Sequence, residues 1–196
     1  IASSGGVAYG RFAKGTGSNS AAYGIATKAL GTKSVAVGSD AVANTEFTVA
    51  VGAGANSTGN SAIATGANSV ANGIGNIATG GGANATGNGA VATGTSSVAN
   101  GNNAVALAAN ANATGAKAIA IGSDSKSLAE STLAIGNNAS ASAYTATALG
   151  TNAAASGQKA IAISAGPNST TATELAAIAI GSDSKALGNS SLAIGD

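Results

Sequence analysis

The sequence predicts an all-β fold, a parallel β-roll (solenoid) of about fourteen 14-residue coils with two short strands each. Three observations predict it. A small residue, usually Gly, closes a strand-like triplet every fourteen residues, with one interval of seventeen before Gly181. The triplets alternate apolar, Ala, apolar, as in Val35–Val37 and Ile119–Ile121, and a second Gly recurs seven residues after the first. Self-similarity at a fixed period is typical of a solenoid.

The elements of one coil follow from this pattern in order. The triplet is the first strand, and its closing Gly begins a tight turn. A shorter alternating segment, such as residues 41–43 or 97–99, is the second strand. The middle Gly, as in Gly31 and Gly59, then begins the second turn. Because glycine tolerates positive φ, we expect that backbone conformation at both glycine positions.

Strand geometry decides which side chains face out of the coil. In each triplet the central Ala points one way and its two neighbours point the other. A ring of fourteen residues encloses too little space for branched side chains, so we expect Ala inside and the larger residues outside. The outer stripe consists of Val35, Val37, Val49, Val51, Ile63, Ile77, Val91, Val105, Leu107, Ile119, Ile121, Leu133, Ile135, Leu149, Ile161, Ile163, Ile178, Ile180, Leu192 and Ile194. Soluble monomers rarely expose an apolar stripe of this size, so the sequence predicts an obligate homo-oligomer that buries it.

Composition narrows the function. Charged residues make up 8% of the chain and the net charge is +1, which does not favour a nucleic acid or an anionic membrane as partner. The chain has no Cys or His, and its acids are scattered, so we expect no enzyme activity, no cofactor and no metal site. We expect residues 1–196 to form one domain, because the repeat runs from end to end. Three extra residues in the unit 165–181, around residues 166–168, are predicted to form a bulging turn.

The repeats resemble those of a known family. Residues 177–181 and 184–190 are similar to head repeats of YadA-like trimeric autotransporter adhesins, and the resemblance extends over essentially the whole chain. It implies a left-handed roll, a homotrimer, and a place on the cell surface of Gram-negative bacteria. The outer-membrane anchor would be a C-terminal domain outside this fragment, and the partners would be host extracellular matrix proteins or cell-surface receptors. The implied function is multivalent attachment, with autoaggregation as a further possibility within the family.

Polar residues after the closing Gly are candidates for ligand contact. Three units carry Gly-Ser-Asp, at residues 38–40, 122–124 and 181–183, and two of them continue with Ser-Lys. The candidate ligand-binding residues are Ser39, Asp40, Ser123, Asp124, Lys126, Ser182, Asp183 and Lys185. The alternative is that each Asp only stabilises its turn, as Asp and Ser commonly do. Two other functions stay open for the whole chain, an ice-binding solenoid, although a Thr-x-Thr ladder is missing, and a purely structural spacer.

Overall fold

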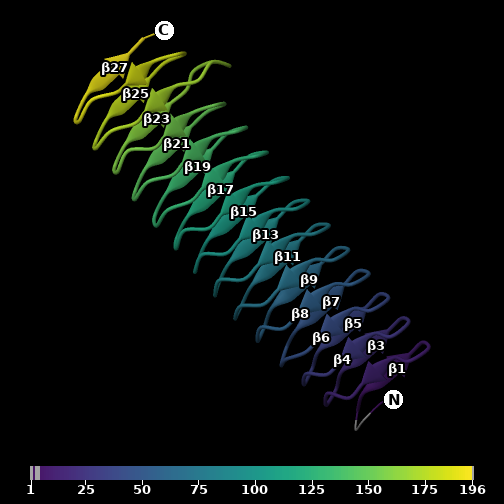
Figure 1. Ribbon diagram of the computed structural model, residues 1–196. Coiled ribbons are helices and arrows are strands. Elements are labelled where there is room, and N and C mark those ends of the chain that lie inside the picture. The colour runs from purple at the N-terminus through teal and green to yellow at the C-terminus, as the bar shows by residue number, and fades with distance from the viewer. Residues whose placement is uncertain (1, 3–4, 196) are drawn as a thin grey trace. The chain divides into compact units, whose positions relative to one another are not determined.

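The computed structural model describes Ala2 and residues 5–195, which form strands and turns. Fourteen three-residue strands alternate along this part of the chain with thirteen two-residue strands. This confirms the all-β class, and thirteen coils have both strands, close to the expected fourteen (Figure 1). No described residue belongs to a helix, so none of them contributes to a membrane-spanning helix. The chain divides into two compact units, Ile1–Ser97 and Val98–Asp196. The assignment of residues 1–196 to one domain stays a prediction.

The first unit contains two parallel sheets that share its coils. Its three-residue strands are β1 (Val7–Tyr9), β3 (Ala21–Tyr23), β5 (Val35–Val37), β7 (Val49–Val51), β9 (Ile63–Thr65), β11 (Ile77–Thr79) and β13 (Val91–Thr93). Its two-residue strands are β2 (Lys14–Gly15), β4 (Lys28–Ala29), β6 (Val42–Ala43), β8 (Asn56–Ser57), β10 (Val70–Ala71) and β12 (Asn84–Ala85). Each strand pairs in parallel with the equivalent strand of the next coil, as Val35 does with Val49 and Val42 with Asn56.

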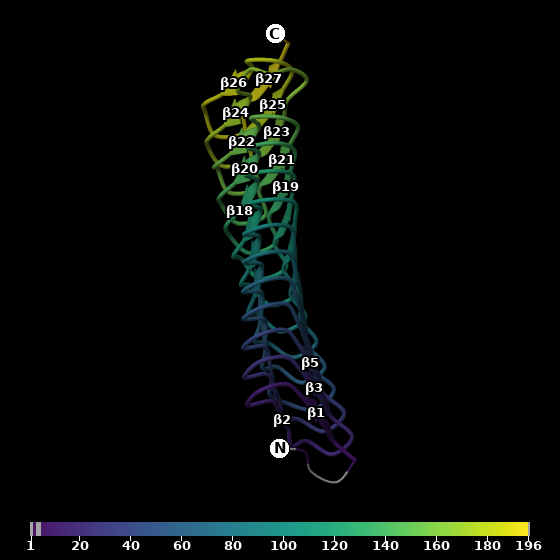
Figure 2. The same cartoon turned by 90° about the vertical axis from the view of Figure 1, so that its right-hand side faces the viewer.

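The second unit repeats the same design. Its three-residue strands are β15 (Val105–Leu107), β17 (Ile119–Ile121), β19 (Leu133–Ile135), β21 (Thr147–Leu149), β23 (Ile161–Ile163), β25 (Ile178–Ile180) and β27 (Leu192–Ile194). Its two-residue strands are β14 (Val98–Ala99), β16 (Asn112–Ala113), β18 (Lys126–Ser127), β20 (Ser140–Ala141), β22 (Ala154–Ala155), β24 (Thr171–Ala172) and β26 (Lys185–Ala186). Figure 2 shows two separate rows of strands in this unit. The even-numbered strands β20, β22, β24 and β26 lie in one row, and the odd-numbered strands β19, β21, β23, β25 and β27 lie in the other.

Alanine fills the interior of the coils. The central Ala of the triplets is inaccessible to solvent, as at Ala36 and Ala120, and so are the two Ala residues that flank Val42. Every buried apolar side chain among the described residues is an alanine. The branched residues on either side of the central Ala lie outside, which confirms the predicted orientation. The physical reason is the narrow coil, in which only methyl groups and small polar side chains fit between the two sheets.

Glycine occurs at the closing and middle positions of a coil for different reasons. The closing glycines have positive φ, as at Gly38 (126°), but the middle glycines do not, so the expectation for the middle position is wrong. A Cβ atom on Gly31 would lie 1.8 Å from the carbonyl oxygen of Thr45 in the next coil, and one on Gly101 would lie 1.9 Å from that of Gly115. At Gly31 and Gly101 the next coil therefore approaches too closely for a side chain, although Thr45 and Ala129 occupy the same position in other coils. Positive φ occurs two residues later instead, for example at Lys33 (55°).

Small polar side chains complete the interior, and most of them bond to backbone carbonyl groups. The Ser57 hydroxyl donates to the Ala62 carbonyl oxygen at 2.9 Å, and the Thr48 hydroxyl donates to the Thr45 carbonyl oxygen at 2.6 Å. The largest fully buried side chain is that of Asn76. Its amide donates to the Ala85 carbonyl oxygen at 2.8 Å, and its Oδ1 accepts from the Ala90 N–H at 2.9 Å. Asn76 thus ties one coil to the next from inside.

Candidate interaction surfaces

The sheet of three-residue strands in the first unit carries an aliphatic face. Its members in the predicted stripe are half-buried or exposed, and none is buried: Val35, Val37, Val49, Val51, Ile63, Ile77 and Val91. They stack in register, so that Val49 lies between Val35 and Ile63 on adjacent strands. Three threonines, Thr65, Thr79 and Thr93, continue one column of this face.

The second unit has the same aliphatic face on its own three-residue strands. The predicted residues are again half-buried or exposed: Val105, Leu107, Ile119, Ile121, Leu133, Ile135, Leu149, Ile161, Ile163, Ile178, Ile180, Leu192 and Ile194. The name aliphatic face is used below for these residues and those of the first unit. The structure therefore brings the predicted stripe together on one sheet in each unit. Its role as a subunit interface stays a prediction.

The polar candidates lie in the turns that follow the closing glycines. Asp40, Asp124 and Asp183 all have positive φ, between 57° and 64°. The Ser39 hydroxyl donates to Asp40 Oδ2 at 3.1 Å, and Ser123 donates to Asp124 Oδ2 at 3.4 Å. Short polar side chains tolerate the left-handed conformation, because they bond locally to the turn. Local contacts of this kind agree with the turn-stabilising interpretation for Asp40 and Asp124.

These polar candidates do not gather into one site. In the second unit, Asn138 and Asn152 occupy the same turn position as Asp124 and Asp183 and lie in the coils between them. Asp124 accepts from the Asn110 amide at 3.1 Å, and Asn138 donates to Asn152 Oδ1 at 2.9 Å, so this corner is a ladder of amide contacts. Lys126 is exposed and Ser182 is half-buried, and the ligand role of all eight candidates stays a prediction.

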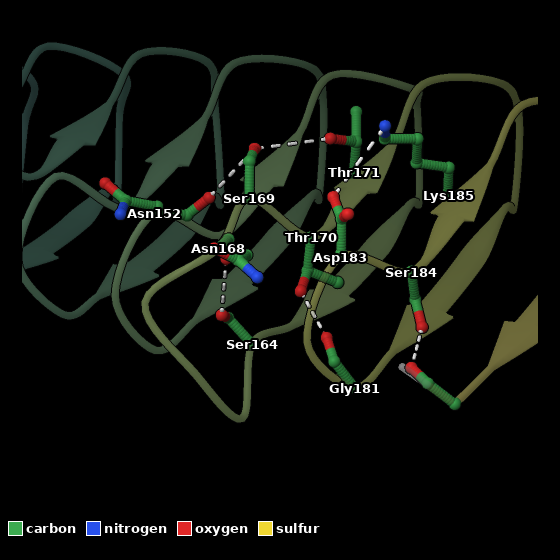
Figure 3. A network of polar contacts seen from close by, with 11 residues as sticks. Asn152, Ser164, Asn168, Ser169, Thr170, Thr171, Gly181, Asp183, Ser184 and Lys185 are labelled. Atoms are coloured by element: carbon green, nitrogen blue, oxygen red, sulfur yellow. Dashed lines mark hydrogen bonds and ion pairs between the residues drawn. The ribbon is translucent and has the colours of Figure 1, made fainter.

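One ion pair joins two of the candidates. The Lys185 ammonium lies 3.7 Å from Asp183 Oδ1 (Figure 3), and both side chains are more than half exposed. An exposed pair of this kind contributes about 0–1 kcal/mol to stability. The pair leaves both groups accessible to water and to a partner.

The three extra residues form a loop between β23 and β24. The Ser164 hydroxyl donates to the carbonyl oxygens of Gly166 at 2.9 Å and Asn168 at 3.2 Å. From the preceding coil the Asn152 amide donates to the Pro167 carbonyl oxygen at 2.6 Å. Figure 3 shows this loop bulging away from the strands. Beyond it the register resumes, with Ala155 beside Ala172 and Ile163 beside Ile180, so the predicted bulging turn leaves the roll intact.

The described residues offer surfaces rather than cavities. They contain no detectable pocket, and no group of three or more acidic side chains positioned to hold a metal ion.

The sequence reasoning missed one cluster of exposed residues at the start of the chain. Tyr9, Phe12 and Tyr23 are exposed, with Tyr9 at 76%, and four basic residues lie between positions 11 and 33. The sequence does show this excess of basic residues, because no acid precedes Asp40. The net charge of the whole chain conceals it, because acids later in the sequence offset these cations.

Comparison with known proteins identifies the family of the repeats. The family model described as the YadA head domain repeat (2 copies) matches residues 7–41, 29–55, 85–107, 109–125, 113–139, 127–153, 141–163 and 172–196, which together cover more than half of the chain. Among solved structures, the chain is similar to the collagen-binding domain of the Yersinia adhesin YadA, with 24% sequence identity and a TM-score of 0.46 over 92% of this chain and 68% of that one. No curated protein sequence matches the chain.

Proposed function

The chain belongs to the family of YadA head domain repeats, and from this membership we propose that it is the head of a trimeric adhesin on a bacterial surface. The family is one of adhesin heads, a non-enzymatic kind of protein. The proposed activity is multivalent attachment to host extracellular matrix proteins or cell-surface receptors, together with autoaggregation of the cells that carry it.

The exposed aliphatic face is the observation that supports the proposed trimer. Within a single chain, Val35, Ile119 and their equivalents keep part of their surface in water, while the interior buries little more than Ala methyl groups. Burying a branched aliphatic side chain stabilises by about 1.5–3 kcal/mol. Covering the aliphatic face with sister subunits supplies the missing burial. The homotrimer is thus the folded unit in this proposal.

Adhesion would depend on repetition rather than on a single pocket. Three identical subunits and many similar coils present the same turns again and again, so weak contacts add up to high avidity. The exposed turn residues Asp40, Asp124 and Asp183, with Lys126 and Lys185, are proposed contacts of this kind. An anchor domain outside these 196 residues would hold the head in the Gram-negative outer membrane.

Two measurements test the proposal. Sedimentation equilibrium of the 196-residue chain is expected to give three times the chain mass, and a stable folded monomer would refute the trimer. Beads coated with the chain are expected to attach to surfaces of extracellular matrix proteins or to cultured cells more than beads coated with an unrelated protein. Attachment no greater than that of the control beads, with an intact trimer, would favour the structural spacer instead.

A further inference from the structure

The basic residues of the first coils are distributed unevenly. Arg11, Lys14, Lys28 and Lys33 are half of the eight Lys and Arg residues in the chain, and the first acid in the sequence is Asp40. All four side chains are exposed. These four residues are called the basic surface below.

Two members of the basic surface stand side by side. Lys14 begins β2 and Lys28 begins β4, and the two are register partners on adjacent parallel strands. Adjacent strands are about 4.8 Å apart. Gly15 and Ala29, which follow them, are buried, so both lysines face away from the interior. Like charges in direct register destabilise a sheet. Folding alone therefore gives no reason for this pair.

No described acid forms an ion pair with the basic surface. Within the described part of the chain, the one ion pair is that of Lys185 with Asp183. The acids next in sequence are Asp40, which accepts from the Ser39 hydroxyl, and Glu46 in the following turn. Arg11 and Lys33 lie over aromatic rings instead, 4.8 Å from the ring centre of Phe12 and 5.1 Å from that of Phe47. A cation–π contact orients the cation but leaves its charge available to an anion.

The basic surface stays accessible when sister subunits cover the aliphatic face. Lys14 and Lys28 belong to the sheet of two-residue strands, whereas the aliphatic face belongs to the other sheet. Arg11 lies in the turn that leads into β2, and Lys33 lies in the turn that follows β4, so they flank the lysine pair at its two ends. A trimer would carry three such surfaces.

We propose that the basic surface binds a sulfated polysaccharide. The exposed charge without an ion-pair partner favours a polyanion, and the paired lysines suit a chain that bears anionic groups at short intervals. The exposed ring of Phe12 beside Arg11 supplies an apolar face against which a sugar ring packs. The inference rests on the proposed function in one respect: a place outside the cell selects a polysaccharide over a nucleic acid.

Heparin, as a sulfated polysaccharide, is the probe for the first experiment. Affinity for heparin is measured at several salt concentrations for the natural chain and for the double variant Lys14→Gln/Lys28→Gln. The control is Lys117→Gln/Lys159→Gln, which removes the same charge from exposed positions of the second unit. We expect Lys14→Gln/Lys28→Gln to bind heparin at least about tenfold more weakly than the natural chain. The slope of log affinity against log salt should correspond to roughly two fewer released ions. The control is expected to bind nearly as well as the natural chain.

Three results would overturn the inference. Both double variants could lose the same heparin affinity, the natural chain could fail to bind heparin in physiological salt, or it could bind DNA as tightly as heparin. Folding is checked by thermal unfolding at low salt, where Lys14→Gln/Lys28→Gln is expected to be at least as stable as the natural chain, because it removes a like-charge pair.

Attachment to cultured cells separates this inference from the proposed function. Removal of sulfated polysaccharide from the cells by heparinase is expected to reduce attachment of the chain severalfold. Undiminished attachment to treated cells would overturn the polysaccharide inference and leave adhesion standing. Heparin binding without attachment to any cell would overturn the adhesin function and leave the polysaccharide site standing.

Discussion

The Asn76 side-chain amide donates a hydrogen bond of 2.8 Å to the Ala85 carbonyl oxygen across the interior of the roll. Asn76 Oδ1 also accepts from the Ala90 N–H, in the next coil. Equivalent positions in neighbouring coils hold Ala62 and Ala90. One buried amide therefore replaces a methyl group and links two coils of an interior made mostly of alanine.

Replacing Asn76 with Ala is expected to lower the free energy of unfolding by about 1–2 kcal/mol, because two buried hydrogen bonds are lost and a small cavity remains. Asn76→Asp keeps the volume but turns the donor toward Ala85 into an acceptor, so at neutral pH its loss should be larger. Urea unfolding measures both. An unchanged midpoint for Asn76→Asp would contradict the hydrogen-bonding assignment.

Gly59 should not tolerate a methyl group, because the next coil lies against it. A Cβ atom on Gly59 would lie 2.0 Å from the Gly73 carbonyl oxygen, so Gly59→Ala is expected to cost about 1–3 kcal/mol through overpacking. Gly188 is the matched control, because its Cβ atom would meet nothing closer than Ser191 Cβ at 3.7 Å. Thermal unfolding of both variants tests this. Similar losses at the two positions would show that close approach is not the cause.

Thr145 is a branched residue with a φ of 54°. The left-handed conformation costs such residues about 1–2 kcal/mol, and Asn tolerates it better. Thr145→Asn is therefore expected to raise the free energy of unfolding by about 0.5–1 kcal/mol. The reverse change, Asn138→Thr, should lower it, since Asn138 has the same conformation and bonds to Asn152. Denaturant midpoints that move in the opposite directions would refute the strain argument.

A charge on the aliphatic face should disrupt the proposed trimer. Ile77→Glu is expected to raise the concentration for half-assembly at least about tenfold, because the burial of one branched side chain is worth about 1.5–3 kcal/mol. Val70→Glu is the control on the other sheet, where the equivalent outward positions hold Lys28 and Asn56. Sedimentation velocity compares the two variants. Equal dissociation, or none in either, would place the interface elsewhere.

Much of the fold could be predicted from spacing. The position of Ala36 inside, with Val35 and Val37 outside, follows from strand alternation in a ring too small for branched residues. The fourteen-residue period places equivalent residues in register on successive coils, as the pairing of Ala36 with Ala50 shows. The loop after Ser164 was predictable for the same reason, because one interval of seventeen must be accommodated outside the strands.

The candidate polar site was less predictable, because sequence motifs do not show what a side chain contacts. The Gly-Ser-Asp units looked alike, yet Asp124 accepts from Asn110 whereas Asp183 pairs with Lys185. Their partners come from neighbouring coils or from the next strand, and small differences in those residues change the role of each Asp.

The sequence by itself determined the repeat, the two strands of each coil, and which residues face in or out, because these depend only on periodicity and side-chain size. The tertiary structure alone decided why Gly31 must be glycine, where positive φ occurs, and that Asn76 spans the interior. Those properties depend on the distance between backbones of adjacent coils. That distance is set when the coils pack, and no pattern along the chain encodes it directly.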